Sequence, residues 1–321
     1  MRCAILDDYQ GVALSLADWA SLDGVQARSF PDPIPYPAIA DALAGFEIVV
    51  AMRERTRFDA ALLARLPALR LLVTTGMRNA SIDLDAAAAR GVAVCGTPIL
   101  GTPTPELAWG LILSLVRHIP AEVAGMRAGK RWQPRIGVGL AGKTLGVIGL
   151  GKIGATMARL AAAFGMATVA WSPNLTDARA AAAGASRAPS LLALMAQADI
   201  ATVHMVLAPA TRGLVDGRAL AAMKPEAYLV NTSRGPLVDE AALVAALSDG
   251  RIAGAALDVF DTEPLPPGHP FRTLPNVIAT PHVGYVTREN YRGFYDGAVA
   301  DIAAWRAGRM VRVLGKGVIS L

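Results

Sequence analysis

Residues 144–154 constrain the fold of this 321-residue chain most strongly, because they join an apolar run to a glycine-rich turn. The run 144–148 carries no charge and is typical of a fully buried parallel strand. The turn has the pattern G-x-G-x-x-G, and residues 155–164 are predicted to form a helix. A strand before this pattern and a helix after it indicate dinucleotide binding rather than a simple structural turn.

Each glycine of the turn has a mechanical role. Gly149 makes the tight turn, Gly151 lets the backbone approach a pyrophosphate, and Gly154 lets the helix pack on the strand. The N-terminus of the helix offers free N–H groups and a partial positive charge to phosphates. We therefore expect the cofactor-binding residues of this segment to be Gly149, Gly151, Lys152, Ile153 and Gly154.

A second glycine-rich pattern lies immediately upstream. Residues 137–144 fit the P-loop pattern G-x-x-x-x-G-K-[ST], which requires a strand before it and a helix after it. The preceding residues 132–135 do not resemble a strand, and Thr144 opens a strand instead of a helix. We interpret this match as chance. The competing hypothesis, a nucleoside triphosphatase, predicts Mg-dependent ATP hydrolysis that is lost in Lys143→Ala.

The composition, 53% hydrophobic and 18% charged, is that of a globular chain long enough for two domains. The net charge of +5 comes from mostly scattered basic residues, which favours a solvated surface over a nucleic-acid-binding face. Cys3 and Cys95 lie in apolar, strand-like runs without metal-ligand spacing. We therefore expect no metal site, no nucleic-acid partner, and buried free thiols in a reducing compartment.

The sequence contains no apparent targeting or membrane segment. Asp7 and Asp8 interrupt any apolar core of a signal peptide. The longest helix-like apolar run, 107–116, is shorter than the about 20 residues that span a bilayer. We expect a soluble, cytoplasmic protein without a membrane partner.

Predicted strands and helices alternate along both halves of the chain. The expected strands are 3–6, 46–51, 71–75 and 92–95 in the first half, and 167–171, 200–205, 227–231, 252–257 and 277–280 after the glycine turn. The alternation predicts βαβ units, so the expected fold class is α/β with two doubly wound parallel-sheet domains. Residues 96–105, rich in Pro and Gly, mark a domain boundary, and a last helix at about 288–307 closes the chain.

Three strand ends of the second half carry ionisable residues, namely Arg234, Glu263 and His282. In a doubly wound sheet, the loops after the carboxyl ends of the strands face the bound dinucleotide. Hydride transfer to a 2-keto acid needs a cation for the carboxylate, ideally an arginine, and a proton donor for the carbonyl oxygen, for which a histidine is suited. A carboxylate would orient the histidine and favour its protonated form.

Each of these residues also has an ordinary structural explanation, as a surface cation, a turn residue before a proline, or a hydrogen-bonded loop histidine. Their joint position at strand ends beside a dinucleotide turn favours catalysis. The other histidines suit the role less well. His118 ends a helix, His204 has no acid near it in the sequence, and His269 lies in a Pro-rich loop.

Two strand-end loops of the first half carry cations. Arg53 follows one strand, and Gly76, Met77 and Arg78 follow the next. Substrate binding and an exposed surface position explain Arg53 and Arg78 equally well, whereas for Arg55 we favour the surface. The segment around Gly76 would offer backbone N–H groups to a carboxylate.

The motifs of the chain resemble those of the D-isomer-specific 2-hydroxyacid dehydrogenase family over nearly its whole length. They are GLGKIG at 149–154, NTSRG at 231–235, LDVF at 257–260 with TEPL at 262–265, and TPHVG at 280–284. The resemblance implies that Arg234 binds the substrate carboxylate or carbonyl. It also implies that His282 is the catalytic acid–base and Glu263 its partner.

The resemblance further implies that Asp258 touches the nicotinamide carboxamide, and we place Thr232 with it among the cofactor-binding residues. It implies a Rossmann cofactor domain at residues 101–285, inserted in a flavodoxin-like substrate domain made of residues 1–100 and 286–321. Members of the family work as dimers, so we expect a homodimer.

The sequence departs from the family at the end of the second cofactor-domain strand. Many members have an acid there that holds the ribose 2′-OH, whereas residues 171–174 are Trp-Ser-Pro-Asn. Ser172 and Asn174 remain as candidates to bond the ribose. Without the acid, repulsion toward a 2′-phosphate is removed, but no Arg or Lys is adjacent in the sequence, so NAD and NADP both stay open. In the substrate loop, Arg78 stands near the position of a glycine in many members and indicates an additional anionic group on the substrate.

Together these features predict an oxidoreductase, an NAD(P)-dependent D-2-hydroxyacid dehydrogenase that acts on the CH–OH group of a small 2-hydroxy acid. Its counterpart substrate would be the 2-keto acid. The alternative is a dinucleotide-sensing binding protein on the same fold with little turnover, because a fold does not determine a function.

Overall fold

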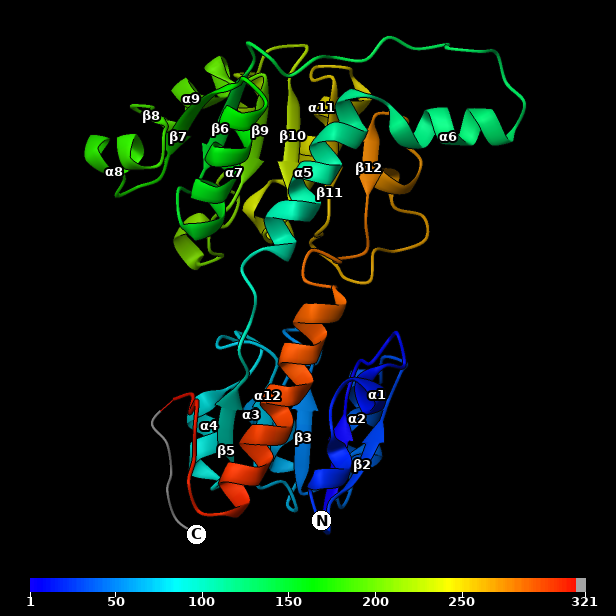
Figure 1. Cartoon of the computed structure of the whole chain (residues 1–321), viewed down its shortest axis with the longest axis vertical. Helices are drawn as coiled ribbons and strands as arrows, with labels where there is room; N and C mark the ends of the chain where they lie inside the picture. Colours follow the sequence, from blue (N-terminus) through cyan, green and yellow to red (C-terminus); the bar gives the residue numbers. More distant parts are fainter. Residues whose placement is uncertain (316–321) are drawn as a thin grey trace. The chain divides into compact units, whose positions relative to one another are not determined.

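The computed structural model describes residues 1–315 and divides the chain into two compact units (Figure 1). Unit 1 combines Met1–Leu100 with the segment that begins at Val286, and unit 2 is Gly101–Tyr285. Each unit contains an all-parallel sheet with helices on both faces, which confirms the predicted α/β class with two doubly wound domains.

The sheet of unit 1 has the strand order β2-β1-β3-β4-β5, which is the order of flavodoxin-like folds. Three of its strands are apolar runs in which every residue is buried, as a parallel sheet between two helical layers requires. The strands are β1 (Arg2–Ile5), β2 (Gln26–Ser29), β3 (Ile48–Ala51), β4 (Leu71–Thr74) and β5 (Ala93–Gly96).

Helices cover both faces of this sheet. One face packs against α2 (Tyr36–Ala42), α3 (Ala60–Ala64) and α4 (Leu84–Ala89). On the other side, α12 (Arg288–Arg306) packs on β4, β5 and the short helix α1 (Ala13–Leu16). Cys3 and Cys95 are free and buried in this sheet, and burial raises the pKa of each thiol to about 12, so both stay protonated.

The sheet of unit 2 has the strand order β12-β11-β10-β9-β6-β7-β8, in which the direction of winding changes between β6 and β9 as in Rossmann folds. The strands are β6 (Thr144–Ile148), β7 (Ala167–Trp171), β8 (Ser186–Arg187), β9 (Ile200–Val203), β10 (Tyr228–Asn231), β11 (Gly254–Leu257) and β12 (Val277–Ala279). This arrangement confirms the Rossmann domain expected from the sequence.

Two hydrophobic layers enclose the second sheet. The first contains side chains of α5 (Pro103–Val116), α7 (Lys152–Ala163) and α8 (Asp177–Ala182). The second contains side chains of α9 (Leu191–Gln197), α10 (Gly217–Ala221) and α11 (Glu240–Ser248). Short 3-10 helices occur in loops of both units, at Trp19–Ser21, Pro209–Thr211, Gly235–Leu237 and Pro270–Arg272.

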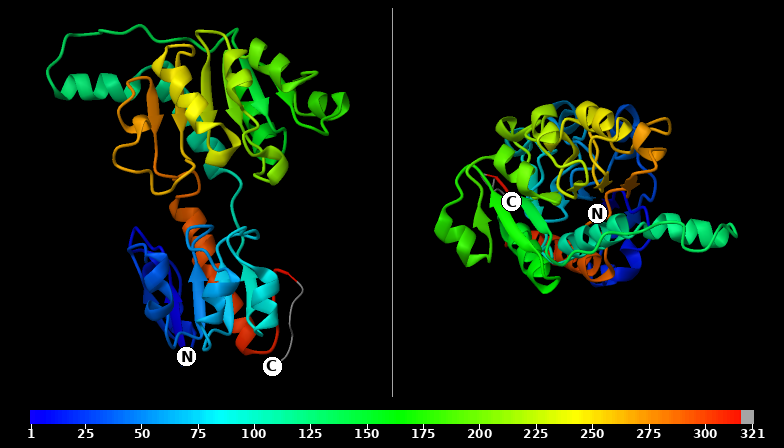
Figure 2. Two further views of the ribbon diagram at one scale, coloured as in Figure 1. Left: turned by 180° about the vertical axis from the view of Figure 1, so that it is seen from behind. Right: turned by 90° about the horizontal axis from the view of Figure 1, so that it is seen from above.

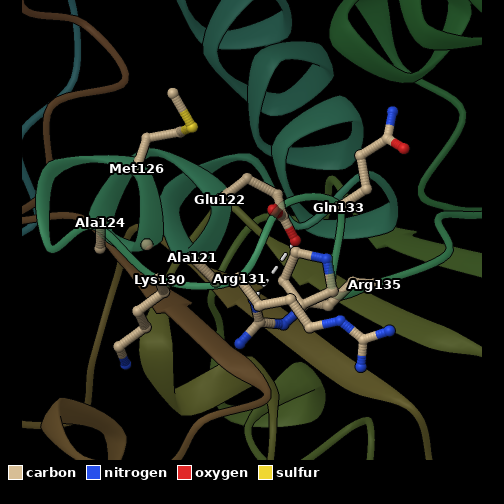
Figure 3. A pocket seen from close by; sticks show the side chains of 10 residues that line it. Ala121, Glu122, Ala124, Met126, Lys130, Arg131, Gln133 and Arg135 are labelled. Atoms are coloured by element: carbon tan, nitrogen blue, oxygen red, sulfur yellow. Dashed lines mark hydrogen bonds and ion pairs between the residues drawn. The ribbon is translucent and has the colours of Figure 1, made fainter.

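Helix α6 (Ile119–Arg127) and the segment after it project from the body of unit 2 (Figures 1 and 2). No residue of α6 is buried. The helix and residues 130–135 border a pocket of about 220 Å³, across which Arg135 Nη1 lies 3.2 Å from Glu122 Oε1 (Figure 3). None of the predicted cofactor, substrate or catalytic residues line this pocket.

No single helix within residues 1–315 is long and apolar enough to cross a membrane. The pair of α5 and α6 meets the requirements of length and composition only when the two helices are taken together, and a bend of 62° separates them.

The register of the unit 2 sheet aligns the carboxyl ends of six strands in one row. The row passes from β7 to β12 through the paired residues Trp171, Ile148, Val203, Asn231, Leu257 and Ala279. Six loops therefore begin on the same edge of the sheet, and their first residues are Ser172, Gly149, His204, Thr232, Asp258 and Thr280. The change in winding between β6 and β9 falls within this row, which is where doubly wound sheets bind ligands.

Candidate active site

The glycine turn connects β6 to α7 in the way the sequence predicts. Gly149 has φ +99°, and a Cβ there would lie 2.5 Å from His204 O, so only glycine fits. A Cβ on Gly154 would collide with Gly149 O, whereas Gly151 faces open space. The first turn of α7 leaves backbone N–H groups without partners in the helix. The turn thus has both the close helix–strand packing and the open backbone that a diphosphate requires.

The loop after β10 holds Arg234 by bonds within the loop and to the neighbouring strand end. Asn231 Nδ2 donates to Arg234 O at 2.9 Å, and Ser233 Oγ donates to Val203 O at 2.8 Å. Arg234 Nη1 also donates to Ser233 O at 2.7 Å. At Gly235 the chain packs so closely on the backbone of Phe260 that a Cβ would collide with it, which fixes the β10 and β11 loops against each other.

Glu263 and His282 form a pair. Glu263 Oε2 lies 2.6 Å from His282 Nδ1, so the Nδ1–H donates to the carboxylate and Nε2 is not used by this bond. The other oxygen, Oε1, accepts from Phe260 N at 3.0 Å, which fixes the carboxylate. The ring of Tyr285 meets the imidazole edge-on at 5.6 Å. Both members of the pair are partly accessible, with 22% of the His282 side chain and 32% of the Glu263 side chain exposed.

Asp258 braces the loop that carries His282. Its Oδ1 accepts from Thr280 Oγ1 at 2.6 Å and from Val283 N at 2.8 Å, and its Oδ2 accepts from Gly284 N at 2.8 Å. Burial raises the pKa of this carboxyl, although the three hydrogen bonds and His282 act in the opposite direction. The bonds enclose His282, whose φ is +54°. Asp258 therefore positions the histidine, and its contact with a nicotinamide carboxamide stays a prediction.

His204 lies beside the glycine turn. Its backbone N–H donates to Ile148 O at 2.7 Å, and its Nε2 lies 2.9 Å from Thr202 Oγ1. Among the described residues, its buried Nδ1 has no hydrogen-bond partner, and neither has the buried hydroxyl of Thr232. Burial lowers the pKa of His204 to about 4, so the ring is neutral at pH 7. Two unsatisfied polar groups on one sheet edge suit a site that a polar ligand completes.

The buried His204 predicts a pH dependence of stability. As pH falls from 6.5 to about 4, the unfolded chain takes up a proton that the folded chain excludes. The stabilisation is complete above pH 6.5 and decreases below it, by up to about 3 kcal/mol. Urea denaturation from pH 4 to pH 7 should therefore give a shallower pH dependence for His204→Asn than for the wild type. Equal slopes would contradict a neutral buried histidine, and His118→Asn is the control.

In unit 1, Arg53 and Gly76 lie together at the carboxyl edge of the sheet. Arg53 has φ +50°, its N–H donates to Thr75 Oγ1 at 2.9 Å, and its Nη1 donates to Thr75 O at 3.1 Å. The guanidinium passes so close to Gly76 that any Cβ there would collide with it. Met77 and Arg78 are exposed, and Arg78 has no ion-pair or hydrogen-bond partner within residues 1–315. Of the four predicted substrate-binding residues, Arg53 and Gly76 thus contact each other, whereas Met77 and Arg78 lie at the surface.

At the end of β7, Ser172 and Asn174 begin the loop expected to meet the ribose. No cation is adjacent in the sequence, but Arg179 of α8 folds back and its Nη1 donates to Asn174 O at 3.3 Å. The first turn of α8 places the guanidinium beside the loop, and this proximity cannot be seen from adjacency in the sequence.

Other residues that support the site were not identified from the sequence. Asn79 donates to Arg53 O at 2.6 Å and to Thr74 Oγ1 at 2.8 Å, and so holds the unit 1 loops together. In unit 2, the backbone N–H of Phe260 and the ring of Tyr285 contact the Glu263–His282 pair. Asn79 could have been identified from the sequence, because its polar side chain directly follows a predicted substrate-binding residue. The backbone N–H of Phe260 could not, because every residue except proline has one.

The sequence also raised the questions of a P-loop and of a metal site. Thr144 begins β6, so the P-loop pattern at 137–144 has a strand where a P-loop has a helix. Within residues 1–315, no group of three or more His, Cys, Asp or Glu side chains could hold a metal ion.

Comparisons with known proteins agree with this geometry. A family model described as "D-isomer specific 2-hydroxyacid dehydrogenase, NAD binding domain" matches residues 109–284, more than half of the chain. The D-3-phosphoglycerate dehydrogenase of Mycobacterium tuberculosis H37Rv is 42% identical over 241 residues, which are 74% of this chain and 45% of that protein. The match thus spans less than half the length of that relative.

Two further relatives match over most of their own length. The glyoxylate reductase of Aeropyrum pernix is 37% identical over 263 residues, which are 79% of this chain and 78% of that protein. The phosphoglycerate oxidoreductase of Vibrio cholerae O395, whose crystal structure is known, is 36% identical in sequence. The structural match covers 96% of this chain and 99% of that chain, with a TM-score of 0.91.

Proposed function

The chain belongs to the D-isomer-specific 2-hydroxyacid dehydrogenase family, and we propose that it interconverts a 2-keto acid and a D-2-hydroxy acid with NAD(P)H as the cofactor. The observation that carries this proposal is the Glu263–His282 pair, with 2.6 Å between Oε2 and Nδ1. The pair stands at the sheet edge that also carries the glycine turn. An acid–base group and a dinucleotide turn on one edge are what hydride transfer to a carbonyl needs.

The catalytic residues have separate roles in this proposal. His282 donates a proton from Nε2 to the carbonyl oxygen during reduction and accepts it back during oxidation. Glu263 keeps Nδ1 protonated and stabilises the imidazolium. Arg234 binds the substrate carboxylate and polarises the carbonyl, for which its planar guanidinium is suited. When bound, the nicotinamide supplies or accepts the hydride.

The residues present fit a dinucleotide. The open side of Gly151 and the N–H groups of Lys152, Ile153 and Gly154 support diphosphate binding. Ser172 and Asn174 stand where a ribose is expected. On the nicotinamide side, we assign Thr232 and Asp258. The unsatisfied Thr232 hydroxyl supports a polar ligand there.

The substrate would meet groups from the strand-end loops of unit 1. We assign Arg53, Gly76, Met77 and Arg78 to substrate binding. Arg53 is fixed by Thr75, whereas exposed Arg78 is available for a second anionic group, such as a phosphate or a second carboxylate. This supports a substrate with two anionic groups.

The assembly and location are also part of the proposal. Exposed large apolar side chains on and beside α6 support a homodimer that covers them, and they include Ile119, Val123, Met126, Trp132 and Ile136. The buried free thiols support a reducing, cytoplasmic location. The alternative function, a dinucleotide sensor with little turnover, is opposed by the preformed Glu263–His282 pair.

The proposal is tested by incubating the purified protein with NADH or NADPH and a panel of 2-keto acids, while following the absorbance of the reduced nicotinamide. The panel contains glyoxylate, pyruvate, hydroxypyruvate, phenylpyruvate and 2-oxoglutarate, and D-3-phosphoglycerate is assayed in the oxidative direction. We expect turnover, with the highest kcat/KM for a substrate with two anionic groups. Arg78→Ala should lower that value about tenfold, because one charge-assisted hydrogen bond is lost.

The matched control is the same variant, Arg78→Ala, assayed with a monoanionic acid such as pyruvate. Its kcat/KM for that acid should be nearly equal to that of the wild type. An equal loss of kcat/KM for both kinds of substrate would show that Arg78 does not bind a second anionic group. Tight cofactor binding with no turnover of any acid would support the sensor instead.

A further inference from the structure

The cofactor preference can be inferred from the end of β7. Trp171 pairs with Ile148 in the sheet, and its carbonyl oxygen accepts from Gly149 N at 2.8 Å. The loop that begins at Ser172 therefore starts beside the first glycine of the turn. In Rossmann folds the residues at this place meet the 2′ position of the adenosine ribose, where an acid binds a free hydroxyl and an arginine binds a phosphate.

The charges around this loop favour an anion. Residues 171–176 contain no carboxylate. The next acid, Asp177, accepts from Arg187 Nε at 2.6 Å, so its charge is balanced by a neighbour. A 2′-hydroxyl would therefore lack the carboxylate acceptor that NAD-binding sites provide. A 2′-phosphate would meet no unbalanced negative charge.

Arg179 supplies a cation at the same place. Thr176 caps α8 by accepting from Arg179 N at 3.3 Å, and this turn brings the arginine back over the loop. Its Nη1 then donates to Asn174 O, also at 3.3 Å. The side chain is exposed, and no carboxylate within residues 1–315 forms an ion pair with it. The bond to a neutral carbonyl holds the guanidinium in position and leaves its charge uncompensated.

We propose that the protein prefers NADP(H) over NAD(H), and that Arg179 binds the 2′-phosphate. Ser172 and Asn174 add neutral hydrogen bonds to the same group. A guanidinium offers several donors, so the bond to Asn174 O and bonds to a phosphate are compatible. This inference rests on the proposed function to the extent that it requires a dinucleotide at the glycine turn.

The test is equilibrium binding, measured by calorimetry on the full chain without substrate. NADPH, NADH, 2′,5′-ADP and 5′-AMP are titrated into the wild type and into Arg179→Gln. We expect NADPH to bind the wild type about 10- to 100-fold more tightly than NADH, and Arg179→Gln to remove most of that difference. The two adenosine fragments should reproduce the pattern, since they differ at the 2′-phosphate. NADH affinity should change less than about twofold.

Arg159→Gln is the matched control, because Arg159 is an exposed arginine of α7 bonded to Thr156 Oγ1 at 2.9 Å. Its NADPH affinity should equal that of the wild type. Equal or tighter binding of NADH, with no effect of Arg179→Gln, would overturn the inference and leave the dehydrogenase proposal intact. A preference for NADPH that survives Arg179→Gln would overturn the role of Arg179. Failure of both dinucleotides to bind would overturn the proposed function as well.

Discussion

Replacing His282 with asparagine is expected to lower kcat by a factor of about 10² to 10⁴, the usual contribution of a positioned general acid–base. The cofactor Kd should change little. Asparagine is the suitable replacement because His282 has φ +54°, a conformation that asparagine tolerates better than alanine does. The loss is therefore one of proton transfer, without added backbone strain. Steady-state kinetics with the best substrate, together with calorimetric titration of the cofactor, measure both quantities.

The control for this experiment is His118→Asn. His118 also has φ +54°, but it precedes α6 and lies outside the row of strand ends. The same substitution in the same backbone conformation should leave kcat unchanged. Wild-type rates in His282→Asn would rule out the acid–base assignment.

Replacing Glu263 with glutamine tests the partner of His282 in the same assay. The carboxylate accepts from His282 Nδ1 with one oxygen and from Phe260 N with the other, whereas an amide has only one oxygen. One of the two donors therefore loses its acceptor. We expect kcat to fall about tenfold or more from loss of that bond and of the charge that stabilises the imidazolium. In the His282→Asn background, Glu263→Gln should have little further effect on kcat, because the two residues act as a unit.

The inner strands of both sheets were predictable because they are continuous apolar runs. The strand ending at Asn231 and the strand ending at Trp171 are found with nearly the expected limits. The edge strands β2 and β8 were not predicted, since their sequences, Gln-Ala-Arg-Ser and Ser-Arg, are polar and partly or fully exposed. The other two edge strands, β5 and β12, are apolar and were predicted, so the two misses follow from the polar sequences and not from the edge position itself.

The positions of the candidate catalytic residues were predictable for a different reason. Strand ends of a parallel sheet meet on one edge, so Arg234, Glu263 and His282 were expected near the glycine turn. The contacts that orient them were not predictable. The bonds from Asp258 to the loop of Thr280 and Gly284 join segments more than 20 residues apart, and they depend on the register of β11 and β12. The approach of Arg179 to Asn174 likewise depends on a turn of helix that sequence adjacency does not show.

Replacing Asp258 with asparagine is expected to reduce both stability and turnover. The carboxylate accepts three hydrogen bonds, from Thr280 Oγ1, Val283 N and Gly284 N. The amide of asparagine would direct an NH₂ group at one of these donors. Loss of one buried, charge-assisted bond should lower the free energy of unfolding by about 1–3 kcal/mol. The unfolding temperature should then fall by about 2–4 °C per kcal/mol. Asp261→Asn is the control, because Asp261 lies in the same loop and its side chain is exposed.

The effect on turnover separates two roles of Asp258. If it positions His282, then Asp258→Asn should lower kcat at least about tenfold in the wild type and have almost no effect on kcat in His282→Asn, because a displaced loop matters only while it carries the acid–base. If it also binds the nicotinamide carboxamide, as we propose, the cofactor Kd should rise by the same factor in both backgrounds. The three bonds around the loop support the positioning role. Equal losses of kcat in both backgrounds, with unchanged cofactor Kd, would exclude positioning of His282 as the cause.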